Sequence, residues 1–311
     1  MVGVRGMKST VSAGGALDNV AEDMERDGFA VVPSFLPETM TESLVSEFQA
    51  LVDAFEPSEH PLTVFETGAQ DQGKEEYFLE SGDKIRYFFE DSVSEAERAA
   101  SPRDAINKLG HALHELNPVF ADFSWDDRIR QVLTAANVPA SQDPVLVQSM
   151  YIVKPPRVGG EVSPHQDGSF LIDTPASCVG LWFALEDATI DNGCLWALPG
   201  SHRDPLYARF ARDEPGGSSA SMSGSFPEFD PETYVPLEVK AGSVVVLHGS
   251  VLHASKANTS ERSRHAYTLH FKHRESEWDP CNWLQSGIGF HGWETPPRSL
   301  PTVAVTAPAL P

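Results

Sequence analysis

Ser163-Pro-His165-Gln-Asp167 is the stretch of sequence on which the fold assignment depends. His165 and Asp167 lie two residues apart, so on an extended backbone both side chains project from the same face of a sheet. One imidazole and one carboxylate can share a metal ion, and a second imidazole would complete one face of an octahedron. The three positions left open are typical of non-haem iron(II) sites. Because His-x-Asp pairs are also common in turns, the assignment depends on the rest of the chain.

Two further histidines follow a β-prone run later in the chain. The run 243–247 is followed by His248 and His253, and either imidazole could supply the third ligand. The spacing alone does not choose between them.

Two arginines open the next alternating segment. Arg262 and Arg264 share a face with Ala266 and Thr268. The other face carries three large apolar side chains, Tyr267, Leu269 and Phe271. An inward arginine needs an anion, because an unpaired buried charge is costly, and its planar fork matches a carboxylate. A salt bridge to one of the many acidic residues is the common alternative, but beside candidate metal ligands the arginines favour a carboxylate site.

The surrounding sequence has the pattern of an antiparallel sandwich or barrel. Short β-prone runs separated by Gly, Pro, Asn and Asp cover 145–153, 179–185, 243–247 and 265–273. Upstream, 29–32 suits a strand, and apolar spacing predicts helices over 38–55 and 105–116. The segment 212–229 is rich in Gly and Ser, and we expect a mobile flap there. The expected fold class is mainly β with flanking helices.

Length and composition fit one large domain. The chain has 311 residues, of which 41% are hydrophobic and 22% charged, enough apolar material for a sizeable core. We expect a single catalytic domain over 19–290, mainly helical to about residue 140 and with its β core over about 145–273. Residues 1–18 are expected to form a disordered extension and 291–311 a C-terminal tail.

Charge and cysteine content narrow the range of expected partners and compartments. The 23 Lys and Arg against 45 Asp and Glu give a net charge of -22, which argues against nucleic acid and anionic membranes as partners. The three cysteines form no CxxC pair and fit a reducing compartment, and no apolar stretch approaches the length of a membrane span. We therefore expect a cytoplasmic monomer that acts on a small-molecule substrate.

Two histidines in the predicted helix 105–116 could also bind a metal. His111 and His114 lie three residues apart, which would place them on one helix face. No third ligand lies nearby in sequence, so we interpret both as structural.

Several longer motifs surround these residues and together are highly specific. They are Ile106-Asn-Lys-Leu-Gly-His-Ala-Leu-His114, Gly159-Gly-Glu-Val-Ser-Pro-His-Gln-Asp167, Asn192-Gly-Cys-Leu-Trp196 and Pro199-Gly-Ser-His202. With these motifs the chain resembles the phytanoyl-CoA dioxygenase (PhyH) family over nearly the whole domain. The resemblance implies a double-stranded β-helix, the jelly roll of cupin-like proteins, with Fe(II) as cofactor and 2-oxoglutarate as co-substrate.

The resemblance also implies roles for individual residues. It places the catalytic metal ligands at His165, Asp167 and His253, which chooses against His248, and it makes Arg264 the anchor for 2-oxoglutarate. Further 2-oxoglutarate neighbours that it implies are Met150, Gln166, Trp182 and Arg262.

One position departs from the family pattern. The family often carries a lysine four residues before the position of Lys108, where it reaches toward the co-substrate, and this chain has Asp104 there. Arg103 or Lys108 could replace that lysine. We include Lys108 among the expected 2-oxoglutarate contacts.

These inferences predict an Fe(II)- and 2-oxoglutarate-dependent dioxygenase. It would hydroxylate, desaturate or cyclise a small molecule and release succinate and CO2. The main alternative is a catalytically silent regulatory protein that binds metal and 2-oxoglutarate, which slow uncoupled succinate formation would reveal. A zinc-dependent cupin hydrolase or isomerase would use the same ligand types but would not need an inward arginine.

Overall fold

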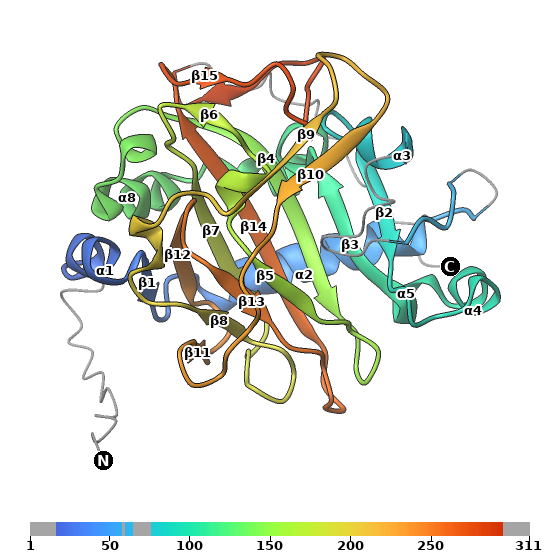
Figure 1. Ribbon diagram of the computed structural model, residues 1–311. Helices are drawn as coiled ribbons and strands as arrows, with labels where there is room; N and C mark the ends of the chain where they lie inside the picture. Colours follow the sequence, from blue (N-terminus) through green and yellow to red (C-terminus); the bar gives the residue numbers. More distant parts are fainter. Residues whose placement is uncertain (1–16, 58–59, 65–75, 295–311) are drawn as a thin grey trace.

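A large antiparallel sheet forms the centre of the protein (Figure 1). The computed structural model describes residues 17–57, 60–64 and 76–294. Eight strands make up this sheet, in the order β1-β12-β7-β14-β4-β3-β2 with β16 beside β4. Their bounds are β1 Phe29–Val32, β2 Ile85–Phe89, β3 Ile106–His111, β4 Pro144–Lys154, β7 Val179–Ala184, β12 Val244–His248, β14 Arg264–His273 and β16 His291–Gly292.

A smaller four-stranded sheet, in the order β11-β8-β13-β5, lies in front of the large sheet in the view of Figure 1. Its strands are β5 Val162–His165, β8 Leu195–Ala197, β11 Val235–Leu237 and β13 His253–Ser255. Two further strand pairs are β9 Ala208–Arg212 with β10 Ala220–Gly224, and β6 Asp173–Thr174 with β15 Glu277–Trp278. Two antiparallel sheets packed in this way form a jelly roll. The predicted fold class, mainly β with flanking helices, is confirmed.

The strand β14 shows how side chains divide between the two faces of the large sheet. It lies between β7 and β4, with Leu269 opposite Leu181 of β7 and Ser149 of β4. On one face Tyr267, Leu269 and Phe271 join the largest hydrophobic cluster. On the other face Arg264, Thr268 and His270 line a cavity. The two-residue alternation thus separates an apolar face from a face that lines the cavity.

Helices cover the apolar face of the large sheet. The helix α2 Glu38–Asp53 packs there, and its Phe48 stacks on Tyr151 of β4 with ring centroids 4.1 Å apart. The helix α7 Pro118–Ser124 places Phe120 4.9 Å from the ring of Tyr267. The other helices are α1 Val20–Asp27, α3 Glu76–Leu79, α4 Glu95–Ala100, α5 Pro102–Ala105, α6 Leu113–Leu116 and α8 Asp127–Ala136. Among the residues described, no helix has the length and apolar character that crossing a bilayer requires.

The predicted helix over 105–116 is wrong, whereas the predicted strand 29–32 and helix 38–55 are confirmed by β1 and α2. Residues 106–111 of this segment form the strand β3, and the helix α6 covers only residues 113–116, so the N-terminal part contributes β1, β2 and β3 to the main sheet. In the pairing of β3 with β2, Asn107 is an extra residue that bulges out of the ladder. Because of this bulge, Ile106 and Leu109 reach the same hydrophobic cluster although they lie three residues apart. The strand therefore imitates helical spacing.

The segment predicted as a flap, 212–229, is irregular over 213–219 and 225–229, but between these stretches it contains the strand β10, which was not predicted. The strand pairs with β9, which sets Met222 opposite Phe210, and both side chains line the cavity. The sequence prediction missed β10 because Ser221 and Ser223 occupy its exposed positions, which leaves only weak apolar alternation.

The two ends of the chain are described in part. Of the predicted extension 1–18, residues 1–16 lie outside the described residues. At the other end β16 pairs with β4, so the predicted domain boundary at residue 290 falls beside a strand of the main sheet. Residues 295–311 of the predicted tail lie outside the described residues.

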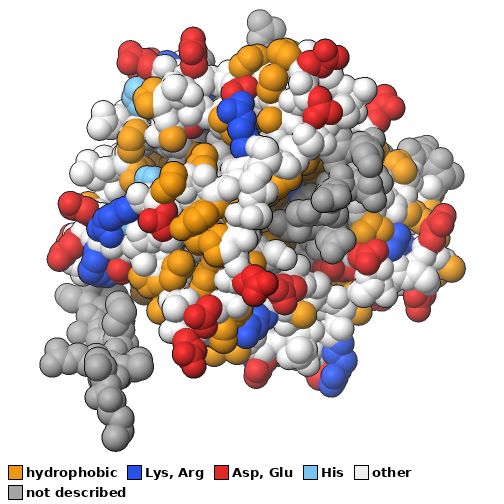
Figure 2. Space-filling model, in the orientation of Figure 1, with side chains coloured by type: hydrophobic (Ala, Val, Ile, Leu, Met, Phe, Trp, Pro, Cys, Tyr) orange, Lys and Arg blue, Asp and Glu red, His pale blue; other side chains and the backbone are white. Residues whose placement is uncertain are grey.

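The surface side chains are unevenly distributed on the face seen in Figure 2. Acidic side chains lie mainly around its edge, and apolar side chains gather toward its centre. On this face the acidic side chains thus lie mainly at the periphery, and the middle offers an apolar surface.

We predict that Leu269→Ala lowers the free energy of unfolding by roughly 2–5 kcal/mol, because it leaves a cavity in the centre of the sheet. Leu269 is fully buried, whereas Leu116 is 40% exposed. Leu116→Ala is therefore the matched control and should cost less than about 1 kcal/mol. Urea denaturation measures both values, and equal losses would contradict the assigned core.

Candidate metal centre

Three side chains converge where the smaller sheet faces the large one. His165 ends β5, His253 begins β13, and the two residues lie opposite each other in the antiparallel pairing. Asp167 follows in a short 3-10 helix, Asp167–Ser169. One ligand atom from each residue lies within 4.8 Å of the other two, a spacing that could hold one metal ion. The carboxylate oxygen Oδ1 of Asp167 is 3.8 Å from Nε2 of His165 and 3.6 Å from Nε2 of His253.

Backbone carbonyls fix the tautomers of both histidines. Nδ1 of His165 donates to the carbonyl of Ser163 at 2.9 Å, and Nδ1 of His253 donates to the carbonyl of Val251 at 3.1 Å. A carbonyl only accepts, so each Nδ1 carries the hydrogen and each Nε2 keeps its lone pair. Hydrogen bonding of the distal nitrogen in this way orients metal-binding histidines.

The ionisation states also suit a metal. Burial and the neighbouring His253 lower the pKa of His165 to about 4, so its imidazole is neutral near pH 7. Burial raises the pKa of Asp167, but His253 and His270 more than offset this and hold the pKa below its usual value. A neutral imidazole and an ionised carboxylate are the forms that bind metal ions.

The two histidines considered as the third ligand lie in different settings, because His248 ends β12 and His253 begins β13. His253 joins the cluster, whereas Nδ1 of His248 accepts a hydrogen bond from the backbone N–H of Ser250 at 3.1 Å. The ring of His248 packs against His202 with centroids 5.4 Å apart. His248 therefore has a separate structural setting.

A third histidine, which the sequence interpretation missed, adjoins the cluster. Nε2 of His270 lies 3.3 Å from Oδ2 of Asp167 and so contacts the carboxylate from the large sheet. The signal was present in the sequence, because the alternation from Arg264 through Thr268 continues to His270 on the same face.

A cavity of about 460 Å³ opens beside these side chains and contains the guanidinium of Arg264. Arg264 is 2% exposed, and its Nε and Nη1 have no hydrogen-bond partner among the described residues. Its guanidinium carbon lies 5.5 Å from the centre of the Trp182 ring. Burial lowers the pKa of Arg264 to about 10, which still leaves it protonated near pH 7. A buried cation with unused donors fits a carboxylate ligand such as 2-oxoglutarate.

The other predicted co-substrate contacts divide into two groups. Met150, Trp182 and Lys108 line the cavity. Arg262 is exposed and does not line the cavity. We expected it to share a face with Arg264, but Arg262 precedes the first residue of β14, so the strand alternation does not extend to it. The amide of Gln166 also does not line the cavity but donates to the carbonyl of Ser250 at 2.8 Å and accepts from the backbone of Tyr207 at 2.8 Å.

The structure also places the residues around the departure at Asp104. Arg103 forms a surface ion pair with Asp53, and Asp104 accepts from the hydroxyl of Ser101, so both face away from the cavity. Lys108 is buried, and burial lowers its pKa well below the usual value. Its ammonium lies 5.7 Å from the ring centre of Phe78. Of the two candidate replacements, only Lys108 is at the cavity.

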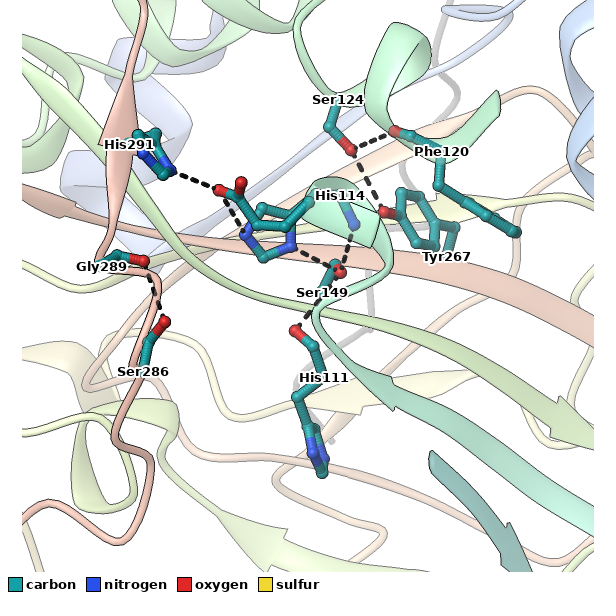
Figure 3. Close-up of polar contacts among 10 residues, drawn as sticks. His111, His114, Phe120, Ser124, Ser149, Tyr267, Ser286, Gly289 and His291 are labelled. Atoms are coloured by element: carbon teal, nitrogen blue, oxygen red, sulfur yellow. Dashed lines mark hydrogen bonds and ion pairs between the residues drawn. The ribbon is translucent and has the colours of Figure 1, made fainter. Parts of the chain in front are cut away.

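His111 and His114 diverge, because they lie on different elements. Figure 3 shows His114 bonded to Ser149. Nε2 of His114 lies 3.6 Å from Oε1 of Glu115, and the same oxygen is hydrogen-bonded to Nδ1 of His291 at 2.8 Å. This network joins α6 to β4 and β16 away from the metal cluster, as a structural interpretation of His114 requires. His111, in contrast, lines the cavity.

Sequence comparison agrees with this site. The family model for phytanoyl-CoA dioxygenase (PhyH) matches residues 24–266. The chain belongs to the phytanoyl-CoA dioxygenase family. The family's domain-containing protein 1 from Bos taurus is 42% identical over 274 residues, 85% of this chain and 93% of the relative. The phytanoyl-CoA dioxygenase of Arabidopsis thaliana is 40% identical over 261 residues, 83% of this chain and 89% of the relative. The predicted family is confirmed.

Solved structures share the fold at lower identity. The epimerase SnoN in complex with Fe3+, alpha ketoglutarate and nogalamycin RO has a TM-score of 0.58 at 18% identity, over 85% of this chain and 86% of SnoN. EctD from S. alaskensis with 2-oxoglutarate and 5-hydroxyectoine has a TM-score of 0.57 at 17% identity, over 88% of this chain and 82% of EctD. At this identity the similarity establishes the fold.

Membership of the phytanoyl-CoA dioxygenase family and the His-Asp-His cluster together identify the chain as an Fe(II)/2-oxoglutarate-dependent oxygenase. The predicted enzyme class and cofactors are therefore confirmed. The family membership also agrees with the unpaired Arg264, which zinc hydrolase chemistry does not require.

We predict that Asp167→Ala and His253→Ala each weaken iron(II) binding by at least about 100-fold, because changes even to outer partners of metal ligands cost about 10- to 100-fold. Anaerobic equilibrium dialysis with metal analysis measures the affinity. His248→Ala is the matched control and should bind iron as the unaltered protein does. Iron loss in His248→Ala, with retention in His253→Ala, would reverse the assignment.

Proposed function

We propose that the protein hydroxylates a C–H bond of a small-molecule substrate. In this reaction 2-oxoglutarate, dioxygen and the substrate give succinate, CO2 and an alcohol, with one oxygen atom in succinate and one in the alcohol. The observation that carries the proposal is the buried Arg264, which lines the same cavity as the His-Asp-His cluster and whose Nε and Nη1 have no partner among the described residues.

The three clustered side chains would hold the iron in this proposal. His165 and His253 offer Nε2 lone pairs, and Asp167 supplies the anionic ligand that offsets part of the metal charge. Bound iron supplies the activation of dioxygen. The protein side chains position the co-substrate and the substrate and exclude water from the site.

The far end of 2-oxoglutarate would bind Arg264. The planar guanidinium can pair with both oxygens of a carboxylate, and Trp182 limits where the guanidinium can lie. We keep Lys108 and Met150 as further contacts because both line the cavity. Gln166 acts indirectly in this proposal, since its two amide bonds hold the backbone near residues 207 and 250 beside the metal cluster. Arg262 has no part in it because of its exposure.

The same proposal places the enzyme in the cytoplasm as a monomer. Cys178, Cys194 and Cys281 are all free thiols, which fits a reducing compartment.

The hydroxylation itself is tested with isotopically labelled dioxygen. We expect succinate and the product each to gain one labelled oxygen when the cognate substrate is present. Succinate release that no compound stimulates above the uncoupled rate would instead support a silent binding protein. Loss of two hydrogens without oxygen gain would indicate desaturation or ring closure.

We predict that Arg264→Ala raises the Kd for 2-oxoglutarate roughly 10- to 100-fold, because a charge-assisted bidentate pair contributes about 1.5–3 kcal/mol. Anaerobic calorimetric titration of the iron-loaded protein measures the Kd. Arg262→Ala removes the same charge two residues away and should leave the Kd within about twofold. Equal effects of the two substitutions would remove Arg264 from its proposed role.

A further inference from the structure

The cavity extends along the strand β14, with Arg264 toward one end and His270 toward the other. Arg264 and His270 lie on the same face six residues apart, which is about 20 Å along a strand. His270 contacts Asp167, so the metal ligands adjoin the end of the cavity opposite the arginine. A co-substrate that reaches from the metal toward Arg264 leaves the His270 end available. This inference rests on the proposed function.

A continuous aromatic wall borders that end of the cavity. Its four rings are Phe170, Phe210, Phe78 and Trp283, all of which line the cavity. The wall starts beside a metal ligand, because Phe170 lies 6.0 Å from the ring of His165. In the order given, the ring centroids of neighbouring members of the wall lie 5.7, 6.3 and 4.2 Å apart. At the far end the ring of Trp283 lies 5.0 Å from the ring of His111. Aromatic faces and edges bind planar rings with about 0.5–1.5 kcal/mol beyond area burial.

Gln148 provides a polar group at this end. It lies opposite His270 in the pairing of β4 with β14 and lines the cavity. The residue is 5% exposed, and its side chain has no hydrogen-bond partner among the described residues. Its amide offers two donors and an acceptor, with which a ligand in the cavity could form hydrogen bonds.

His111 provides an acceptor at the same end. The Ser81 hydroxyl donates its one hydrogen to the carbonyl of Phe78 at 2.6 Å, so its oxygen must accept from Nδ1 of His111 at 2.7 Å. Nε2 of His111 therefore carries a lone pair, and it has no partner among the described residues. A hydroxyl or N–H of a ligand could donate to it.

We infer that the substrate is a planar ring compound that carries a hydroxyl or N–H donor and binds between the aromatic wall and Gln148. The ring body packs on Phe210 and Phe78, and the donor reaches Gln148 or Nε2 of His111. A C–H bond near Phe170 then lies beside the metal ligands. An unbranched acyl chain could pack against the aromatic wall, but it would neither stack on the rings nor form hydrogen bonds with Gln148 and His111.

Binding of matched probes to the unaltered protein tests this inference. The iron- and 2-oxoglutarate-loaded protein is titrated without oxygen, so that binding is measured apart from turnover. The probes are 2-naphthol, 2-methoxynaphthalene, which lacks the donor, and 1-decanol, which keeps the hydroxyl on a linear chain. We expect 2-naphthol to bind roughly two- to tenfold more tightly than either of the others, the value of one hydrogen bond or one stacking contact.

Two substitutions test the named residues. Phe210→Leu and Gln148→Leu should each weaken 2-naphthol binding roughly two- to tenfold, because each removes one type of contact. Phe229→Leu and Gln142→Leu are the matched controls, since neither Phe229 nor Gln142 lines the cavity, and both should bind 2-naphthol as the unaltered protein does.

The outcomes separate this inference from the proposed function. Failure of the unaltered protein to form succinate from 2-oxoglutarate would overturn the proposed function. With that activity present, tighter binding of 1-decanol or decanoyl-CoA than of 2-naphthol would overturn the ring-compound inference. Absence of 2-naphthol binding at millimolar concentration, or unchanged binding in Phe210→Leu and Gln148→Leu, would overturn it as well.

Discussion

The two-residue alternation of β14 is the constraint on which both the fold and the site depend. Because successive side chains of a strand point to opposite faces, the same ten residues seal the core against α2 and α7 and line the cavity. A shift of one residue in register would exchange these faces and bury Arg264 among aromatic rings. Pairing with both β7 and β4 holds the register.

The cavity face contains polar groups that the protein does not satisfy by itself. Arg264, Gln148 and His111 are buried, and each has donors or acceptors without a partner among the described residues. Such groups cost stability unless a ligand or water completes their hydrogen bonds. The apolar face of the sheet, packed by Phe48, Phe120 and their neighbours, offsets that cost. The structure therefore keeps a ready site at the expense of some folding stability.

Much of this could be predicted from local sequence because it follows from short-range periodicity. The strands of the β core and the shared face of Arg264 and Thr268 are properties of alternation. The choice of His253 over His248 came from family resemblance, since spacing left both open and only the pairing of β13 with β5 separates them in space. The strand β3 was missed because the bulge at Asn107 imitates a helix. The aromatic wall could not be read from sequence, because its rings come from segments distant in the chain.

The central claim is that one cavity holds both an iron ion and the two ends of 2-oxoglutarate. A crystal structure of the protein with iron(II) and 2-oxoglutarate, determined without oxygen, tests it most directly. The account predicts metal density bonded to His165, Asp167 and His253, with the distal carboxylate of 2-oxoglutarate paired to the guanidinium of Arg264. Metal held by other side chains, or a distal carboxylate bound away from Arg264, would contradict it.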